Sequence, residues 1–176
     1  KLRKAGVDGG EDLEWRLLAR RMGAAGRIQV GEYALRPGIT PREILADLRD
    51  GDVVRRRFTI VEGWNLRELR AALARAEPLE QEIAGLDDAA LMDALGHPGV
   101  HPEGRFLPET YHYTRGDSDL DLLRRAYDAM DAELERAWES RAQGLPLQSK
   151  EEALVLASIV EKETGVAAER PRIAGV

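Results

Sequence analysis

The strongest constraint on the fold is an amphipathic segment, residues 118–138, whose apolar side chains recur at spacings of three and four. Ser118 followed by Asp121 has the form of a capping box, which predicts that a helix begins here. The apolar residues would then form one stripe with charged residues opposite. They are Leu120, Leu123, Tyr127, Met130, Leu134 and Trp138. Such a stripe has to be buried, either in the chain's own core or against a partner helix.

Two N-terminal segments resemble each other, Tyr33–Leu48 and Phe58–Leu73. Each has a short alternating run, a turn glycine, a capping residue and a glutamate three positions later. These positions are Gly38, Thr40 and Glu43 in the first segment and Gly63, Asn65 and Glu68 in the second. The pattern predicts two strand–turn–helix units in a small β-α-β-α arrangement. We also expect helices at Glu11–Met22 and Asp88–Leu95, and a loop with short extended pieces at residues 105–118.

Composition excludes several classes of protein. The chain has 176 residues, of which 43% are apolar, so it can bury a core. Its net charge of −6 argues against sequence-independent binding to nucleic acid or to an anionic membrane surface. It has no cysteine, which excludes disulfides and thiolate metal sites. The sequence contains no apolar run of about 18 residues, so no membrane-spanning helix is expected within it.

Metal, nucleotide and serine-hydrolase chemistry find little support. His97 and His101 flank prolines in a loop, and neither they nor His112 have an acidic partner at a recognised ligand spacing. The sequence has no glycine-rich phosphate loop, and Ser158 lacks a nucleophile-elbow context. No metal and no organic cofactor are therefore expected.

The segment Ser149–Gly165 points to acid chemistry. An almost wholly apolar stretch, Ala153–Val160, runs directly into Glu161 and Glu163. A carboxyl group held against an apolar wall has its pKa raised, and a protonated carboxyl can donate a proton to a departing glycosidic oxygen. Two helical positions that are two residues apart point in nearly opposite directions, so these glutamates cannot share one pocket. The alternative interpretation is that residues 161–163 form a solvated helix end.

The loop before the long helix carries aromatic and acidic residues together. Phe106, Tyr111 and Tyr113 could stack on sugar rings, while Glu103 and Glu109 could accept hydrogen bonds from hydroxyl or amide groups. The alternative is that the aromatic side chains belong to the core and only the charges are exposed.

These motifs together resemble a known family. The run EGRFLPETYHY (103–113), a helix ending in AW (137–138), GLP (144–146), ASIVEKET (157–164) and ER (169–170) follow one another. In this order they resemble the endolytic murein transglycosylases of the MltG (YceG-like) family. The segment GEYALRPGITPREIL (31–45) looks like the N-terminal region of that family, which carries a LysM-like subdomain.

The resemblance implies an α+β fold. Residues 1–60 would be a small LysM-like β/α subdomain, truncated at its N-terminus. Residues 61–176 would be the N-terminal part of a mainly helical, mixed catalytic domain that is truncated at its C-terminus. Both ends look like cuts, because Lys1 is not a start methionine and Val176 arrives in mid-pattern.

The resemblance also implies a function. Family members are bacterial envelope enzymes that cut nascent peptidoglycan strands internally, between N-acetylmuramic acid (MurNAc) and N-acetylglucosamine (GlcNAc). The expected location is the inner membrane, with a single N-terminal anchor that this chain lacks and this region on the periplasmic side. Expected partners are peptidoglycan glycan strands and cell-wall synthases. The catalytic acid/base would be Glu161, and the residues expected to assist it or to line the substrate cleft are Glu163, Glu109, Thr110, Tyr111 and Phe106.

One acid suffices for a lytic transglycosylase. Ordinary glycosidases use two carboxylates, one of which activates water or attacks the sugar. Here the 6-hydroxyl of MurNAc would attack instead and close a 1,6-anhydro ring. The competing hypothesis is a non-catalytic, LysM-like module that binds peptidoglycan, in which Glu161 would be incidental.

Overall fold

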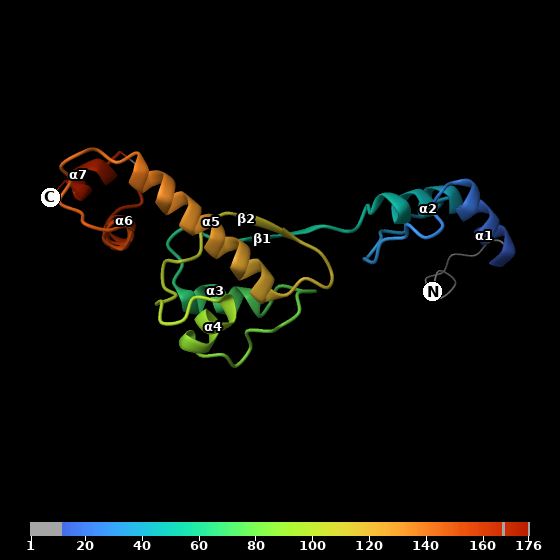
Figure 1. Cartoon of the computed structure of the whole chain (residues 1–176), viewed down its shortest axis with the longest axis horizontal. Helices are drawn as coiled ribbons and strands as arrows, with labels where there is room; N and C mark the ends of the chain where they lie inside the picture. Colours follow the sequence, from blue (N-terminus) through green and yellow to red (C-terminus); the bar gives the residue numbers. More distant parts are fainter. Residues whose placement is uncertain (1–11, 167, 176) are drawn as a thin grey trace. The chain divides into compact units, whose positions relative to one another are not determined.

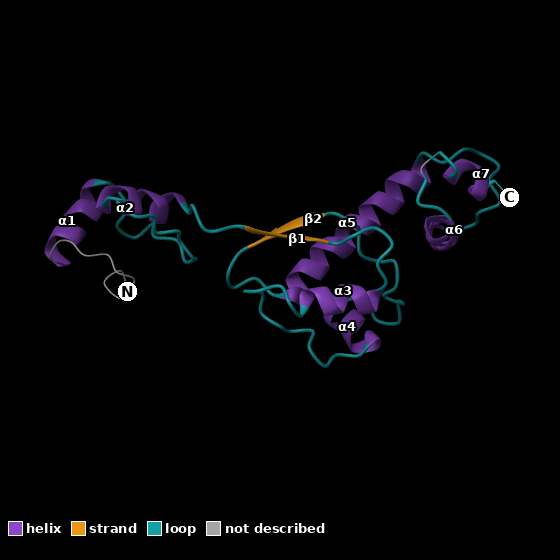
Figure 2. Ribbon diagram, turned by 180° about the vertical axis from the view of Figure 1, so that it is seen from behind, coloured by secondary structure: helices purple, strands orange, loops and turns teal. Residues whose placement is uncertain are grey.

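The fold was obtained as a computed structural model, which describes residues 12–166 and 168–175. The described chain is mainly helical with one two-stranded sheet, an α+β arrangement as predicted (Figure 2). Its elements are α1 (Asp12–Arg21), α2 (Pro41–Asp50), β1 (Arg56–Thr59), α3 (Leu66–Leu73), α4 (Asp88–Leu95), β2 (Thr110–Tyr113), α5 (Asp119–Glu139), α6 (Lys150–Glu163) and α7 (Arg170–Ala174). They divide into two compact units. The first contains residues 12–56 and 114–116, and the second contains residues 57–113 and 117–175.

The first unit contains α1 and α2, which pack together. Helix α2 begins with the predicted capping box, since the Thr40 side chain accepts a hydrogen bond from the Glu43 N–H and the Glu43 carboxylate accepts one from the Thr40 N–H. Its Ile44 and Leu45 are buried. Helix α1 falls within the predicted range 11–22, although the predicted first residue, Glu11, lies outside the described residues.

The β-α-β-α prediction for the two similar segments is confirmed in part: the second segment forms β1, a turn and α3, whereas the first forms α2 without the predicted strand. The extended chain at residues 33–36 is not a strand, and β1 pairs with β2. The chain around residues 29–32 makes isolated backbone bonds, Gln29 N–H to Leu48 and Val54 N–H to Glu32, which do not add up to a ladder. Alternation in sequence indicates an extended chain but does not supply the neighbour that a strand needs.

The LysM-like character of residues 1–60 stays a prediction. Within residues 12–56 the structure describes two packed helices and, apart from the first residue of β1, no strand.

Glu32 joins the short segment 114–116 to the first unit. Its carboxylate lies 3.0 Å from Arg56 Nη1 and 3.1 Å from Arg115 Nε. The hydrogen bonds from Arg56 and then Arg115 lower the pKa of Glu32. Arg115, which lies between β2 and α5, is thus held in the N-terminal unit by its ion pair with Glu32, although the two residues are distant in sequence.

The second unit is built around α5, which begins at the predicted capping box of Ser118 and Asp121 (Figure 1). Leu122, Leu123 and Ala126 are fully buried, and α4, β2 and α6 all contact this helix. The predicted stripe therefore faces the chain's own core over the first half of α5, while Met130, Leu134 and Trp138 are half-buried. Helices α3 and α4 lie where the sequence predicts them, and the α3 capping box of Asn65 and Glu68 forms.

Asp119 connects the start of α5 to the chain before α4. Its side chain is fully buried, and Oδ1 accepts hydrogen bonds from the N–H groups of Glu82 (2.9 Å) and Ile83 (3.2 Å). The backbone of Asp119 also donates to the Glu80 carbonyl. A buried carboxylate is tolerable only where hydrogen-bond donors converge on it, so Asp119 fixes the path of residues 80–83.

Replacing Asp119 by alanine should destabilise the second unit by about 3 kcal/mol, because two backbone N–H groups would lose their acceptor. The measurement is urea unfolding followed by circular dichroism. Asp128→Ala, on the exposed face of the same helix, serves as the control and should change stability by no more than about 0.5 kcal/mol. Equal stability of the two variants would contradict the anchoring role of Asp119.

Candidate active site

Helix α6 carries the residue predicted to be catalytic. It begins after Ser149, whose hydroxyl accepts from the Glu152 N–H, while the Glu152 carboxylate accepts from the Gln148 N–H. The helix continues through the apolar stretch to Glu163 and packs against α5. Glu161 is therefore held near the C-terminal end of a helix that is itself braced by the core helix.

A tight corner folds α7 back against α6. Thr164 ends α6 and is buried, and its hydroxyl donates to the Glu169 carboxylate and accepts from the Val166 N–H. The first residue of α7 is Arg170. The corner thus places Arg170 opposite the last turn of α6.

Glu161 lies at the polar end of an apolar hollow of about 460 Å³ between α6 and α7. Glu161 and Arg170 are its charged residues, and the others are Ala153, Leu156, Ala157, Val160, Pro171 and Ala174. The Glu161 carboxylate accepts a 2.9 Å hydrogen bond from Arg170 Nη2, and its side chain is 33% exposed. The arrangement is a half-buried carboxylate beside an apolar wall, with a guanidinium as its partner.

The turn after β1 also reaches this site. Arg170 Nη2 lies 3.8 Å from the Glu62 carboxylate, and Lys162 Nζ donates to the Gly63 carbonyl at 2.9 Å. Sequence reasoning missed Glu62, and it used Arg170 only as part of the ER motif. No spacing rule connects positions 62, 161 and 170.

Glu163 does not share the hollow with Glu161. It is exposed and makes no ion pair among the described residues. This placement agrees with the helical geometry of two positions that are two residues apart. Its predicted supporting role stays a prediction.

Phe106 and Tyr111 are core residues, not cleft residues. Phe106 is 7% exposed and meets the Tyr127 ring edge-on, and Tyr111 is 9% exposed and donates its hydroxyl to the Leu107 carbonyl. The prediction that they line the glycan cleft is corrected accordingly, because so little of either ring is free for a sugar. The alternative stated for this loop, aromatic residues in the core, describes them.

Glu109 and Thr110 lie at the start of β2. The Glu109 carboxylate accepts from the Thr110 N–H, and the Thr110 hydroxyl meets that of Thr59 across the sheet at 2.9 Å. Neither lines the hollow that contains Glu161. Their predicted contact with substrate stays a prediction.

The model of the YceG-like family matches residues 1–176. The chain belongs to the YceG-like family.

The comparison with solved structures agrees on the fold. A crystal structure of a yceG-like protein from Listeria monocytogenes matches with a TM-score of 0.51 and 18% sequence identity. The match covers 92% of this chain and 58% of the other, so the YceG-like chain spans little more than half the length of that protein. No curated protein matches the chain.

The histidines of the YceG-like chain have structural roles where the structure assigns them contacts. His97 stacks on Tyr127 with ring centroids 3.9 Å apart, and His101 Nδ1 accepts from the Glu103 N–H. Over residues 12–166 and 168–175, no group of three metal-binding side chains comes together. In the same residues no helix is long and apolar enough to cross a membrane.

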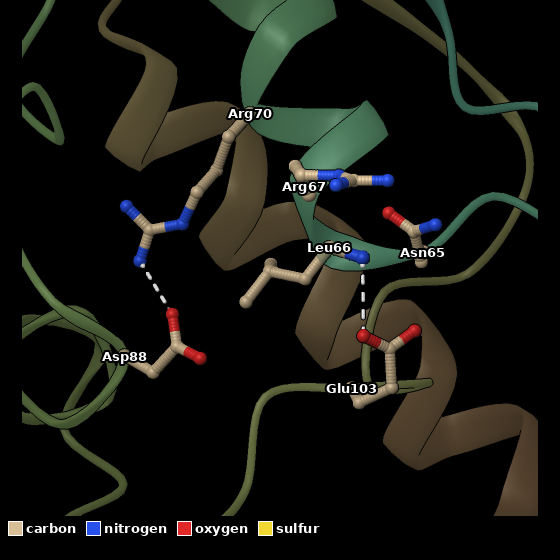
Figure 3. A pocket seen from close by; sticks show the side chains of 6 residues that line it. All are labelled: Asn65, Leu66, Arg67, Arg70, Asp88 and Glu103. Carbon is tan, nitrogen blue, oxygen red and sulfur yellow. Dashed lines mark hydrogen bonds and ion pairs between the residues drawn. The ribbon is translucent and has the colours of Figure 1, made fainter.

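A second hollow, of about 390 Å³, lies at the start of α3 (Figure 3). The Arg70 guanidinium pairs with Asp88 at 3.1 Å, and the Glu103 carboxylate accepts from the Leu66 N–H at 3.1 Å. Two of its carboxylates are thus already bonded to groups of the chain itself. It shares no lining residue with the hollow that contains Glu161, and its lining is more polar than that apolar hollow, with Asn65, Arg67, Arg70, Asp88 and Glu103 beside Leu66.

Burial raises the pKa of Tyr111 to about 12, and the nearby Glu109 carboxylate acts in the same direction. Because the folded-state pKa lies above the ordinary value of about 10, the stabilisation that Tyr111 contributes is complete below pH ~10 and is lost as pH rises through about 12. We expect an ultraviolet titration of the folded protein to show one late tyrosinate component. Tyr111→Phe should remove that component, and its persistence in the variant would assign it to another tyrosine.

Proposed function

We propose that this protein is an endolytic peptidoglycan lytic transglycosylase that cleaves the bond between MurNAc and GlcNAc with Glu161 as its single acid/base. The observation that carries the proposal is the position of Glu161 in a member of the YceG-like family. It is the one carboxylate that lines the apolar hollow between α6 and α7 among the described residues.

The chemistry needs one proton donor. Protonated Glu161 gives its proton to the glycosidic oxygen, and the bond from that oxygen to C1 of MurNAc breaks. The 6-hydroxyl of the same MurNAc attacks C1, and the Glu161 carboxylate accepts the hydroxyl proton. The products are a 1,6-anhydro-MurNAc end and a strand that begins with a free GlcNAc hydroxyl. Glu161 is returned to its protonated state, and no water is consumed.

The surroundings of Glu161 support this assignment. An apolar wall excludes water from one side of the carboxylate, which favours transfer of the proton to an oxygen of the substrate. Glu163 points elsewhere, so the helix offers no carboxylate pair of the kind that a hydrolase uses.

Peptidoglycan glycan strands are the proposed substrate, and cell-wall synthases that make nascent strands are the proposed partners. The proposed location is the periplasmic face of a bacterial inner membrane, with an anchor on the N-terminal side of this region.

Glu161→Gln should lower the release of 1,6-anhydro-muramyl products by at least about 100-fold, because the amide cannot donate the proton. The assay incubates the full-length protein with purified peptidoglycan and identifies the products by mass spectrometry. Glu151→Gln makes the same change at an exposed position on the first turn of α6 and should leave the rate unchanged.

The products distinguish the alternatives. An undiminished rate for Glu161→Gln would overturn the catalytic assignment. Reducing ends in place of anhydro ends would indicate a hydrolase. Binding to peptidoglycan with no product from the unaltered protein would indicate a binding module.

A further inference from the structure

The charges of the chain are divided unevenly between its two units. Residues 12–56 and 114–116 contain ten arginines against seven acidic residues, a net charge of +3. Residues 57–113 and 117–175 contain 13 basic and 23 acidic residues, a net charge of −10, and residues 1–11 contribute the remaining +1. The overall negative charge therefore disfavours contact with an anionic surface through the second unit, but not through the first.

Helix α1 of the first unit has an exposed face that combines leucines with arginines. At 100° per residue, five exposed residues fall within an arc of about 140° around the helix axis. They are Leu13, Arg16, Leu17, Arg20 and Arg21. The side chain of Leu13 is 64% exposed and that of Leu17 is 56% exposed. This set of five residues is called the outer face of α1.

The other side of α1 is turned towards the rest of its unit. Trp15, Leu18 and Ala19 are half-buried there, and α1 packs against α2. The two acidic residues of the helix, Asp12 and Glu14, lie just beyond the two edges of the outer face and have interaction partners of their own. No acidic side chain of α1 therefore lies among the leucines and arginines of the outer face.

The arginines of the outer face are available to an external anion. Arg16, Arg20 and Arg21 make no ion pair and no side-chain hydrogen bond with any residue that the structure describes. Arg49 and Arg56 of the same unit, in contrast, each pair with a carboxylate. A guanidinium on a long apolar stem can keep its charge in a polar layer while the stem lies along an apolar one.

The combination of side chains distinguishes between anionic partners. The phosphate backbone of a nucleic acid would pair with the arginines but would leave the leucines in water. A bilayer with anionic headgroups offers phosphates to the arginines and an apolar layer, just beneath them, to the leucines. We propose that the outer face of α1 binds the surface of a bilayer that contains anionic lipid, with Leu13 and Leu17 inserted below the phosphates.

The contact is peripheral. A helix of 10 residues is about 15 Å long, roughly half the hydrocarbon thickness of a bilayer, so α1 lies along the surface. Two leucines and three arginines give weak, reversible binding. The contact belongs to the first unit and involves neither Glu161 nor the hollow beside it. Vesicle binding is measured without peptidoglycan, so its outcome does not depend on the proposed transglycosylase activity.

Co-sedimentation with sucrose-loaded vesicles tests this contact. The 176-residue chain is mixed with vesicles of phosphatidylcholine and phosphatidylglycerol in equal parts, or of phosphatidylcholine alone. The salt is about 0.1 M NaCl, at which a Debye length of about 10 Å screens the more distant charges of the second unit. We expect at least about tenfold stronger binding to the anionic vesicles, and weaker binding as NaCl rises to about 0.5 M. Equal binding to both vesicles, or none to the anionic ones, would overturn the proposal.

A matched pair of triple variants locates the charges responsible. Changing the three arginines of the outer face to glutamine should weaken binding to the anionic vesicles by about fivefold for each arginine. The control changes three exposed arginines of the second unit, Arg67, Arg75 and Arg172, to glutamine and should not weaken binding. Both variants lower the net charge by the same amount. Equal losses in the two would mean that overall charge controls binding, which contradicts a site on α1.

A second pair tests the leucines. The double variant Leu13→Ser and Leu17→Ser should weaken binding at least about tenfold, because the inserted apolar area is lost. Val155→Ser with Ile159→Ser makes a similar change at exposed positions of α6 and should have no effect. Full binding by the leucine variant would show that the arginines attract polyanions in general, and the proposal would fail. Circular dichroism checks that each variant folds, and Leu17→Ser or Arg20→Gln alone provides the same comparison if a multiple variant does not.

Discussion

Burial of the first half of α5 is the interaction on which the second unit depends. Leu122, Leu123 and Ala126 are fully enclosed, and the elements before and after the helix pack on it: α4 and β2 on one hand and α6 on the other. Closely packed side chains of this kind leave few alternative arrangements. Asp119 makes this packing specific. Its buried carboxylate accepts hydrogen bonds from the N–H groups of residues 82 and 83, which fixes the position of that segment relative to α5.

Two sets of contacts connect the candidate site to α5 and so determine its geometry. Helix α6 is braced by α5, and the corner at Thr164 then determines where α7 begins. Neither set involves the carboxylate itself. The placement of a functional side chain near the end of a helix depends on the contacts that hold the helix and the residues after it. Here those contacts are the packing of α6 against α5 and the hydrogen bonds of the Thr164 hydroxyl.

Local signals in the sequence predicted local structure well. The boxes at Thr40, Asn65 and Ser118 all begin helices, because a cap depends on residues only three positions apart. The pairing of strands could not be predicted from such local signals. The alternating run near residue 33 has no strand beside it, and β1 joins β2 from the loop before α5.

In the candidate site, too, local features could be predicted from the sequence and contacts between distant segments could not. Periodicity along one helix separated Glu161 from Glu163. The approach of Glu62 and Arg170 arises from a turn and a corner far apart in the chain, which no spacing rule encodes. The prediction that Phe106 and Tyr111 of the aromatic loop line the cleft failed because it, too, depended on contacts with a distant segment. Phe106 and Tyr111 have surfaces that suit a sugar or a core equally, and only the position of α5 settles which one they meet.

The position of Glu62 bears on the choice between hydrolysis and ring closure. Through the shared Arg170 nitrogen, the Glu62 and Glu161 carboxylates come within about 7 Å, a separation at which two carboxylates in a glycosidase can place a water between them. Here Arg170 Nη2 lies near both carboxylates, 2.9 Å from Glu161 and 3.8 Å from Glu62, and Glu62 does not line the hollow. A water activated by Glu62 would have to reach the sugar past Arg170. Under the proposed function, a nucleophile carried by the substrate, the 6-hydroxyl of MurNAc, would avoid that obstacle where an attacking water would not.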